Sequence, residues 1–272
     1  MSLEAFFLPT AGGRLFCLFH GPDDGTARKG AVIYVHPFAE EMNKSRRMAG
    51  LQAKAMASAG YAVLQVDLFG CGDSAGDFGE ATWESWIANL IEAARWLRER
   101  SDAPLWWWGL RTGALLAVAA ATRFGQPGRL LLWQPVMQGK QYLRQFLRLK
   151  IAGELLDGGA KGAMNRVKVQ LADGVPVEIA GYMLSPALAS GLEQAELTLP
   201  DGVQRVALIE IASGATVELS PVASARLAAW RVAGSEVRGV SVPGPAFWQT
   251  TEIEECPALI DASLRLLAEM DA

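Results

Sequence analysis

Short, mostly apolar runs alternate along the chain with longer segments of mixed polarity. Four runs have the length and composition of buried parallel strands: 31–35, 61–66, 105–108 and 129–133. Three segments carry apolar residues at helical spacing: 45–59, 82–100 and 113–123. Two earlier runs, 6–9 and 14–19, are joined through Gly12 and Gly13 and predict an antiparallel meander. Because strands that alternate with helices form right-handed βαβ units, the sequence predicts a mostly parallel central sheet with helices on both faces.

The alternation breaks within residues 137–202. There, 142–156 predicts a basic helix, and 167–179 predicts a hairpin that turns at Asp173-Gly174. The earlier pattern then resumes with a strand at 205–212, a helix opened by Ser220-Pro221, a strand at 237–242 and a helix from Pro257. We therefore expect three consecutive parts: an N-terminal core part at 1–136, a lid inserted after the sixth strand at 137–202, and a C-terminal core part at 203–272.

Composition excludes several classes of protein. The 272 residues carry a net charge of -4, and acidic residues match basic ones along the chain, so we expect no nucleic-acid binding. The three cysteines are too few and too far apart for a disulfide framework or a zinc site, and we expect no metal or cofactor. Residues 1–10 lack the basic start and long apolar core of a signal peptide. The apolar stretch 104–122 has Arg111 at its centre, so we expect no membrane span and a cytoplasmic protein.

The order of the predicted elements resembles the α/β-hydrolase fold over nearly the whole chain. A meander, parallel βα units, an insertion after the sixth strand and two further βα units follow one another as in that fold. Residues 34–38, Tyr-Val-His-Pro-Phe, end the third strand, where that fold keeps its oxyanion loop. Residues 67–76 look like its D-x-x-G-x-G-x-S-x-G loop.

The turn after the fifth predicted strand departs from this fold's pattern. In α/β-hydrolases the turn is the nucleophile elbow G-x-S-x-G, whose glycines allow a strained backbone while the serine projects above the sheet. Here Gly109 and Gly113 remain, and Arg111 occupies the nucleophile position. A guanidinium group is protonated at any relevant pH, so Arg111 cannot attack a carbonyl carbon.

The histidine base of this fold is also missing from its expected place. It should follow the last strand, but residues 242–248 contain no histidine. The chain has only His20 and His36, which both lie early in the sequence. A Ser-His-Asp triad in the order of this fold therefore cannot be assembled, and the acid position near 210–213 has no histidine to orient.

Three segments carry a closer resemblance. Residues 36–47, 109–111 and 244–250 resemble the bacterial proteins called exosortase A system-associated hydrolase 2. These are α/β-hydrolase-superfamily proteins found beside the exosortase/PEP-CTERM sorting and exopolysaccharide machinery. The resemblance implies a hydrolase fold and partners in that system.

Two roles are open for Arg111. Its guanidinium could bind a carboxylate or phosphate at the pocket mouth, because the helix N-terminus beneath it already favours anions. Alternatively, it could form an internal ion pair with a pocket acid, Glu41 or Asp73, and hold loops together. The two roles are not exclusive.

Two functions of different classes follow. The first is a binding protein for a small molecule, an anion where Arg111 contacts it, and its predicted ligand-binding residues are Phe38, Asp73, Leu110, Arg111, Thr112 and Trp248. The second is an ester or thioester hydrolase or acyl transferase with a displaced catalytic set, and that set is His36, Glu41 and Cys71. The loss of two triad positions favours the binding protein over serine-hydrolase chemistry.

The candidate residues also have purely structural interpretations. His36 could be bonded to nearby backbone, Cys71 could be an inert residue in a glycine-rich turn, and Asp73 could stabilise that turn. Glu41 could be a first-turn helix charge. Trp248 falls where the histidine loop would be and could form a wall of the pocket.

Overall fold

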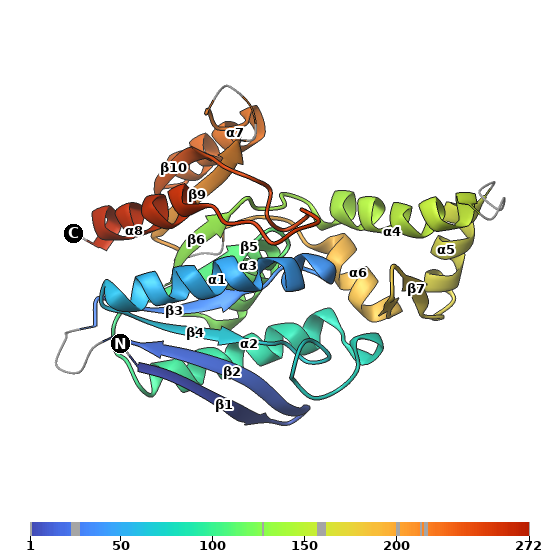
Figure 1. Cartoon of the computed structure of the whole chain (residues 1–272), viewed down its shortest axis with the longest axis horizontal. Helices are drawn as coiled ribbons and strands as arrows, with labels where there is room; N and C mark the ends of the chain where they lie inside the picture. The colour runs from blue at the N-terminus through green and yellow to red at the C-terminus, as the bar shows by residue number, and fades with distance from the viewer. Residues whose placement is uncertain are drawn as a thin grey trace.

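One large twisted sheet organises the molecule (Figure 1). The computed structural model describes residues 2–22, 28–126, 128–156, 162–199, 202–212, 214 and 217–271. Within these residues the sheet has eight strands in the order β1-β2-β4-β3-β5-β6-β9-β10. The strands are β1 (Ser2–Thr10), β2 (Gly13–Gly21), β3 (Gly30–Val35), β4 (Tyr61–Val66), β5 (Leu105–Leu110), β6 (Arg129–Trp133), β9 (Arg205–Ala212) and β10 (Glu236–Pro243).

The pairing of the strands confirms the predicted sheet. The β1–β2 and β2–β4 pairs are antiparallel, and every later pair in the sheet is parallel. This order, with its antiparallel meander and parallel remainder, is that of the α/β-hydrolase fold, which confirms the predicted fold class.

Helices cover both faces of the sheet and create two separate cores. On one face lie α1 (Glu40–Ser58) and α8 (Pro257–Asp271); on the other lie α2 (Trp83–Arg98), α3 (Gly113–Phe124) and α7 (Pro221–Val232). Successive strand residues point to opposite faces. In β5, Trp107 therefore belongs to the α2 and α3 core, while Trp106 and Trp108 belong to the α1 and α8 core.

Helix α1 begins five residues before its predicted start. Glu40 and Glu41 form its first turn, where carboxylates interact favourably with the positive end of the helix dipole. Ala39 precedes them with a positive φ of 51°, which is uncommon for a residue other than glycine. The earlier start places Glu41 beside the turn that follows β5.

Among its described residues, the segment between β6 and β9 contains three helices and a short hairpin: α4 (Gly139–Leu156), α5 (Ala163–Ala172), β7 (Val177–Ile179), β8 (Tyr182–Leu184) and α6 (Pro186–Gln194). The short helix η1 (Phe78–Glu80), from the loop after β4, lies against β8. In Figure 1, α4, α5 and β7 extend to one side of the sheet. The basic helix predicted at 142–156 is confirmed within α4.

The hairpin predicted at 167–179 is wrong. Met164, Val167 and Leu171 pack on the core from one face of α5, so the apolar residues follow helical spacing rather than strand alternation. The actual hairpin joins β7 and β8 through Ala180 and Gly181, which both have positive φ. The lid boundaries at 137–202 stay a prediction. No helix in the described ranges has the length and apolar character needed to cross a membrane.

Candidate functional site

The turn between β5 and α3 keeps the geometry of a nucleophile elbow. Arg111 stands at its tip in a left-handed conformation, with φ of 55°. A Cβ atom at Gly109 would lie 2.5 Å from Ala114 Cα, and one at Gly113 would lie 2.2 Å from the carbonyl oxygen of Val35. Both positions therefore require glycine, and the strained turn is built around an arginine.

A cleft of about 410 Å³ opens above this turn. Its walls include Phe38 before α1, Glu41 on α1, Arg111 at the elbow, Tyr142 and Phe146 on α4, and Trp248 after β10. These residues come from four separate parts of the chain, and the fold brings them to the carboxyl end of the parallel strands. Ligands bind at this end in open α/β sheets.

Arg111 and Glu41 form a loose ion pair in the cleft. Arg111 Nε lies 3.4 Å from Glu41 Oε2, and Arg111 Nη2 lies 3.5 Å from Glu41 Oε1, while the two side chains are 19% and 17% exposed. Charge-assisted hydrogen bonds are normally shorter, about 2.7–2.9 Å. Among the described residues, Arg111 Nε and Glu41 Oε2 are buried without a hydrogen-bond partner. The pair expected between Arg111 and Glu41 is therefore present, and both groups keep unused hydrogen-bonding capacity.

Burial and charge act in opposite directions on Glu41. Desolvation raises its pKa, and the neighbouring Arg111 guanidinium together with a hydrogen bond from Tyr142 holds the rise back. Burial raises the pKa of Tyr142, so its hydroxyl stays protonated and can donate to the carboxylate. The arrangement keeps a partly buried carboxyl group beside a fixed positive charge.

Aromatic rings enclose the guanidinium. The Cζ atom of Arg111 lies 5.2 Å from the centre of the Trp248 ring and 6.0 Å from that of Tyr142. Phe38 contacts Tyr142 and Phe146 edge to face. These rings favour a cation at this point and give the cleft apolar walls.

One of the backbone donors expected of an oxyanion hole is engaged. In α/β-hydrolases this hole uses the N–H after the nucleophile and an N–H from the loop after the third strand. Here the buried Phe38 N–H donates to Thr112 Oγ1 at 2.9 Å. Thr112 itself is buried at the start of α3. Thr112 Oγ1 thus accepts the hydrogen bond that the Phe38 N–H would have to give to an oxyanion.

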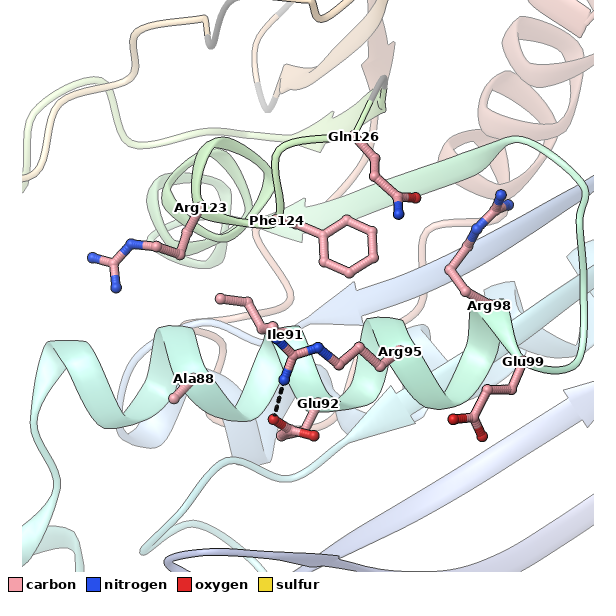
Figure 2. A pocket seen from close by; sticks show the side chains of 9 residues that line it. All are labelled: Ala88, Ile91, Glu92, Arg95, Arg98, Glu99, Arg123, Phe124 and Gln126. Atoms are coloured by element: carbon pink, nitrogen blue, oxygen red, sulfur yellow. Dashed lines mark hydrogen bonds and ion pairs between the residues drawn. The ribbon is translucent and has the colours of Figure 1, made fainter.

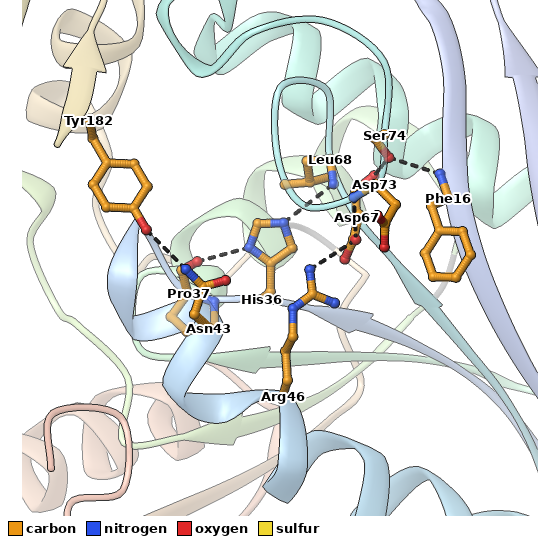
Figure 3. A network of polar contacts seen from close by, with 10 residues as sticks. All are labelled: Phe16, His36, Pro37, Asn43, Arg46, Asp67, Leu68, Asp73, Ser74 and Tyr182. Atoms are coloured by element: carbon orange, nitrogen blue, oxygen red, sulfur yellow. Dashed lines mark hydrogen bonds and ion pairs between the residues drawn. The ribbon is translucent and has the colours of Figure 1, made fainter. Parts of the chain in front are cut away.

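His36 is held by two backbone bonds away from this cleft (Figure 3). Its Nδ1–H donates to the carbonyl oxygen of Pro37 at 2.8 Å, and Nε2 accepts from the Leu68 N–H at 3.4 Å. Burial lowers its pKa, so the ring stays neutral. The side chain lines a different cavity, beneath α1, together with Arg46.

The loop after β4 is fixed around Asp67. Asp67 Oδ2 accepts from Arg46 Nη2 at 2.9 Å and from the Asp73 N–H at 3.1 Å (Figure 3). Cys71 in this loop is buried, and desolvation, aided by the Asp67 charge, raises the pKa of its thiol to about 12. The side chain of Asp73 is exposed and does not line the elbow cleft.

The structure brings together part of the predicted site. Phe38, Glu41, Arg111 and Trp248 meet in the cleft, and Leu110 and Thr112 lie buried beside it. His36, Cys71 and Asp73 lie outside its lining. The other lining residues were not predicted from the sequence: Ala39, Glu40, Lys44, Tyr142, Gln145, Phe146, Leu149 and Gln249. The one feature of the sequence that could have indicated Tyr142 and its neighbours was the position of the 142–156 helix directly after the sixth strand.

A larger surface groove lies between α2 and α3 (Figure 2) and has about 840 Å³. Its arginines are already engaged: Arg95 pairs with Glu92, Arg123 pairs with Glu84, and Arg98 donates to the Ala103 carbonyl oxygen. It contains no strained residue or buried unpaired group, so the elbow cleft is the stronger candidate. Across the described residues there is no group of three or more His, Cys, Asp or Glu side chains that could hold a metal ion.

Comparison with known proteins supports the fold assignment. Residues 26–174 match the family model described as serine aminopeptidase, S33. This match spans more than half of the 272 residues. No curated protein matches the chain.

Solved structures with similar folds are distant in sequence. XC6422 from Xanthomonas campestris, described as an α/β serine hydrolase without a lid, is 15% identical with a TM-score of 0.59, covering 98% of this chain and 94% of that one. Est1E from Butyrivibrio proteoclasticus, solved with ferulic acid, is 15% identical with a TM-score of 0.64, covering 97% and 98%. A carboxyl esterase from Bacillus coagulans, solved with glycerol, is 14% identical with a TM-score of 0.64, covering 100% of both chains.

Proposed function

This chain belongs to the serine aminopeptidase S33 family of α/β hydrolases, and from that premise we propose that its elbow cleft binds a small organic anion instead of performing serine-hydrolase chemistry. The observation that carries the proposal is Arg111 at the tip of an intact elbow, in the place of the nucleophile. The ligand class is a carboxylate or phosphate compound with an apolar, preferably aromatic, body.

Three features argue against acyl transfer at the elbow. Arg111 is no nucleophile. Both ring nitrogens of His36 are bonded to backbone atoms, so the ring is not free to act as a base. The Phe38 N–H is bonded to Thr112 and is not free for an oxyanion. Restoring hydrolysis would require changes at all three positions.

Three features favour an anion. The Arg111 guanidinium stands over the N-terminus of α3, a twelve-residue helix whose dipole adds positive potential there. The contact between Arg111 Nε and Glu41 Oε2 is long, 3.4 Å, so an incoming carboxylate can replace Glu41 as the partner of the guanidinium and form a shorter hydrogen bond. Trp248 and Tyr142 supply apolar surface for an aromatic ring. Est1E, which has the same fold, was solved with ferulic acid, a phenolic carboxylic acid, and this makes ferulate a reasonable first probe.

Calorimetric titration with ferulate, benzoate and inorganic phosphate tests this proposal. We expect saturable binding to the wild-type protein and at least a tenfold weaker affinity in Arg111→Gln. Arg123→Gln is the matched control, because Arg123 lies at the far end of the same helix in an exposed pair with Glu84. Equal affinities in the wild type and Arg111→Gln, or no binding of any of the three anions, would overturn the proposal.

One observation supports a second candidate function, that of an enzyme. Glu41 lies in the cleft with a raised pKa, as expected of a general acid or base. The alternative is an ester or thioester hydrolase that uses Glu41, although His36 and Cys71, the other two members of the expected set, lie outside the cleft lining. Assays with short p-nitrophenyl esters and fluorophosphonate labelling separate the two functions. We expect little turnover and no labelling, whereas robust hydrolysis that Glu41→Gln abolishes would establish the enzyme.

We further propose that the protein serves the exosortase and exopolysaccharide system from the cytoplasm. The support is the resemblance of residues 36–47 and 244–250 to exosortase A system-associated hydrolase 2. Deletion of the gene in its own host should alter exopolysaccharide export or PEP-CTERM protein sorting, and cell fractionation should recover the protein in the cytoplasm. A deletion strain with unchanged export and sorting would contradict this assignment.

A further inference from the structure

A second cavity lies beneath α1, separate from the elbow cleft. It has about 250 Å³ and is bounded by β2, β3 and β4 on one side and by α1 on the other. Its volume is below the range of about 300–1,000 Å³ typical of drug-sized ligands. The cavity therefore suits a molecule of fragment size.

Two buried side chains of this cavity have unused polar atoms. His20 on β2 is 6% exposed and Tyr34 on β3 is 5% exposed. Among the residues that the structure describes, neither His20 Nδ1 nor Tyr34 Oη has a hydrogen-bond partner. Buried polar atoms are almost always paired in folded proteins, so two such atoms around one cavity call for a partner.

The protonation of these groups defines what the partner must offer. His20 Nε2 lies 2.9 Å from Gln65 Oε1, and because a carbonyl oxygen only accepts, Nε2 carries the proton. Burial lowers the pKa of His20, so the ring is neutral and Nδ1 is a bare acceptor. Burial raises the pKa of Tyr34, so its hydroxyl stays protonated and can donate or accept. A ligand should therefore carry a hydroxyl group.

The remaining lining is electrically balanced and largely apolar. Arg46 and Asp67 both line the cavity, and they are paired with each other at 2.9 Å (Figure 3). Phe16 and Leu18 contribute apolar surface from β2. An ionic ligand would find no unpaired countercharge among these residues and would pay the large cost of burying a charge, whereas an uncharged ligand avoids that cost.

We propose that this cavity is a second binding site, for a small uncharged compound with a hydroxyl group on an apolar ring, of the phenol or cyclic alcohol class. The hydroxyl donates to His20 Nδ1 or exchanges a hydrogen bond with Tyr34, and the ring lies against the apolar residues of β2. The site does not involve Arg111, so it is independent of the anion proposed for the elbow cleft.

Phenol and toluene are matched probes, because they differ by the hydroxyl group. In ¹⁵N-labelled protein we expect millimolar phenol to shift the His20 Nδ1 signal and to bind at least ten times more tightly than toluene. The chain has two histidines, and both line this cavity, but both nitrogens of His36 are already bonded to backbone, so its nitrogen signals should move less than those of His20. Equal binding of the two probes, or no shift of His20, would overturn the proposal.

Three variants complete the test. His20→Phe and Tyr34→Phe should each weaken phenol binding at least tenfold, and Tyr34→Phe should also raise the melting temperature, because it removes an unpaired buried hydroxyl. Arg111→Gln should leave phenol binding unchanged. Circular dichroism establishes that each variant is folded. Phenol binding that survives both phenylalanine variants, or that is lost in Arg111→Gln, would place phenol elsewhere and refute the site.

Discussion

Replacing Arg111 with glutamine tests the electrostatics of the cleft most sharply. The change keeps a polar side chain at the elbow but leaves the Glu41 carboxylate without its cation. Exposed ion pairs contribute about 0–1 kcal/mol, and breaking a buried pair costs about 3–5 kcal/mol. With side chains 19% and 17% exposed and a separation of 3.4 Å, this pair lies between those limits. We expect a loss of about 1–3 kcal/mol in the free energy of unfolding at neutral pH.

The loss should depend on pH with a definite sign. Burial raises the pKa of Glu41 above its ordinary value of 4.5, and Arg111 opposes that rise. A carboxyl group whose pKa is higher in the folded than in the unfolded protein stabilises the folded state when the pH is below the pKa of the unfolded state. This stabilisation is lost as the pH rises through the pKa of the folded state. Without Arg111 the folded pKa rises further, so the variant loses more stability than the wild type as the pH increases. The two proteins should differ little at about pH 4 and most at about pH 8.

Urea unfolding of four proteins across this pH range checks the reasoning. Glu41→Gln combined with Arg111→Gln should recover part of the loss, because the double variant strands no charge. Arg123→Gln breaks an exposed pair and should cost less than about 1 kcal/mol at every pH. A loss in Arg111→Gln that is the same at low and high pH, or no recovery in the double variant, would refute the assigned role of the pair.

Three further predictions concern the elbow and the neighbouring loop. Thr112→Val should cost about 1–3 kcal/mol in urea unfolding, because it leaves the buried Phe38 N–H unpaired, while Thr112→Ser should cost far less. Gly113→Ala should lower the free energy of unfolding by about 3 kcal/mol, because the added methyl group collides with the adjacent strand. Its control, Gly50→Ala, has nothing within 4 Å of the added methyl group and should raise the free energy of unfolding by about 1 kcal/mol. Similar effects of the two changes would contradict the elbow geometry. Cys71, with its pKa raised to about 12, should be alkylated by iodoacetamide far more slowly in the folded than in the unfolded protein at about pH 8, and fast alkylation in the folded state would indicate a reactive thiolate.

The sequence predicted the strands and helices of the central sheet well, because the patterns that indicate them are formed by residues close together in the chain. Short apolar runs such as 105–108, which alternate with helical patterns, favour buried strands, and the glycines at 109 and 113 match the elbow pattern, whose lack of steric room the structure confirms. Glu41 was one of the two acids predicted as a partner of Arg111, because the loops that carry them meet at the same end of adjacent strands, and the structure selects it over Asp73.

The remaining parts of the site depend on long-range packing, which the sequence does not display. Tyr142 reaches the cleft from α4, and only the placement of that helix over the sheet shows this. Over a short stretch, the apolar residues of α5 fit the spacing of a strand as well as that of a helix. Their packing against the core determines that the segment is helical, and the sequence does not show this packing. The hydrogen bond from the Leu68 N–H to His36 Nε2 likewise depends on the position of the loop after β4.

A crystal structure of the protein grown with benzoate tests the central claim directly. We predict the benzoate carboxylate within hydrogen-bond distance of the Arg111 guanidinium, with the ring between Trp248 and Tyr142 and with Glu41 displaced from its present contact. A structure at saturating benzoate in which Arg111 stays on Glu41 and the carboxylate is bound elsewhere would contradict the claim that the elbow arginine is an anion receptor.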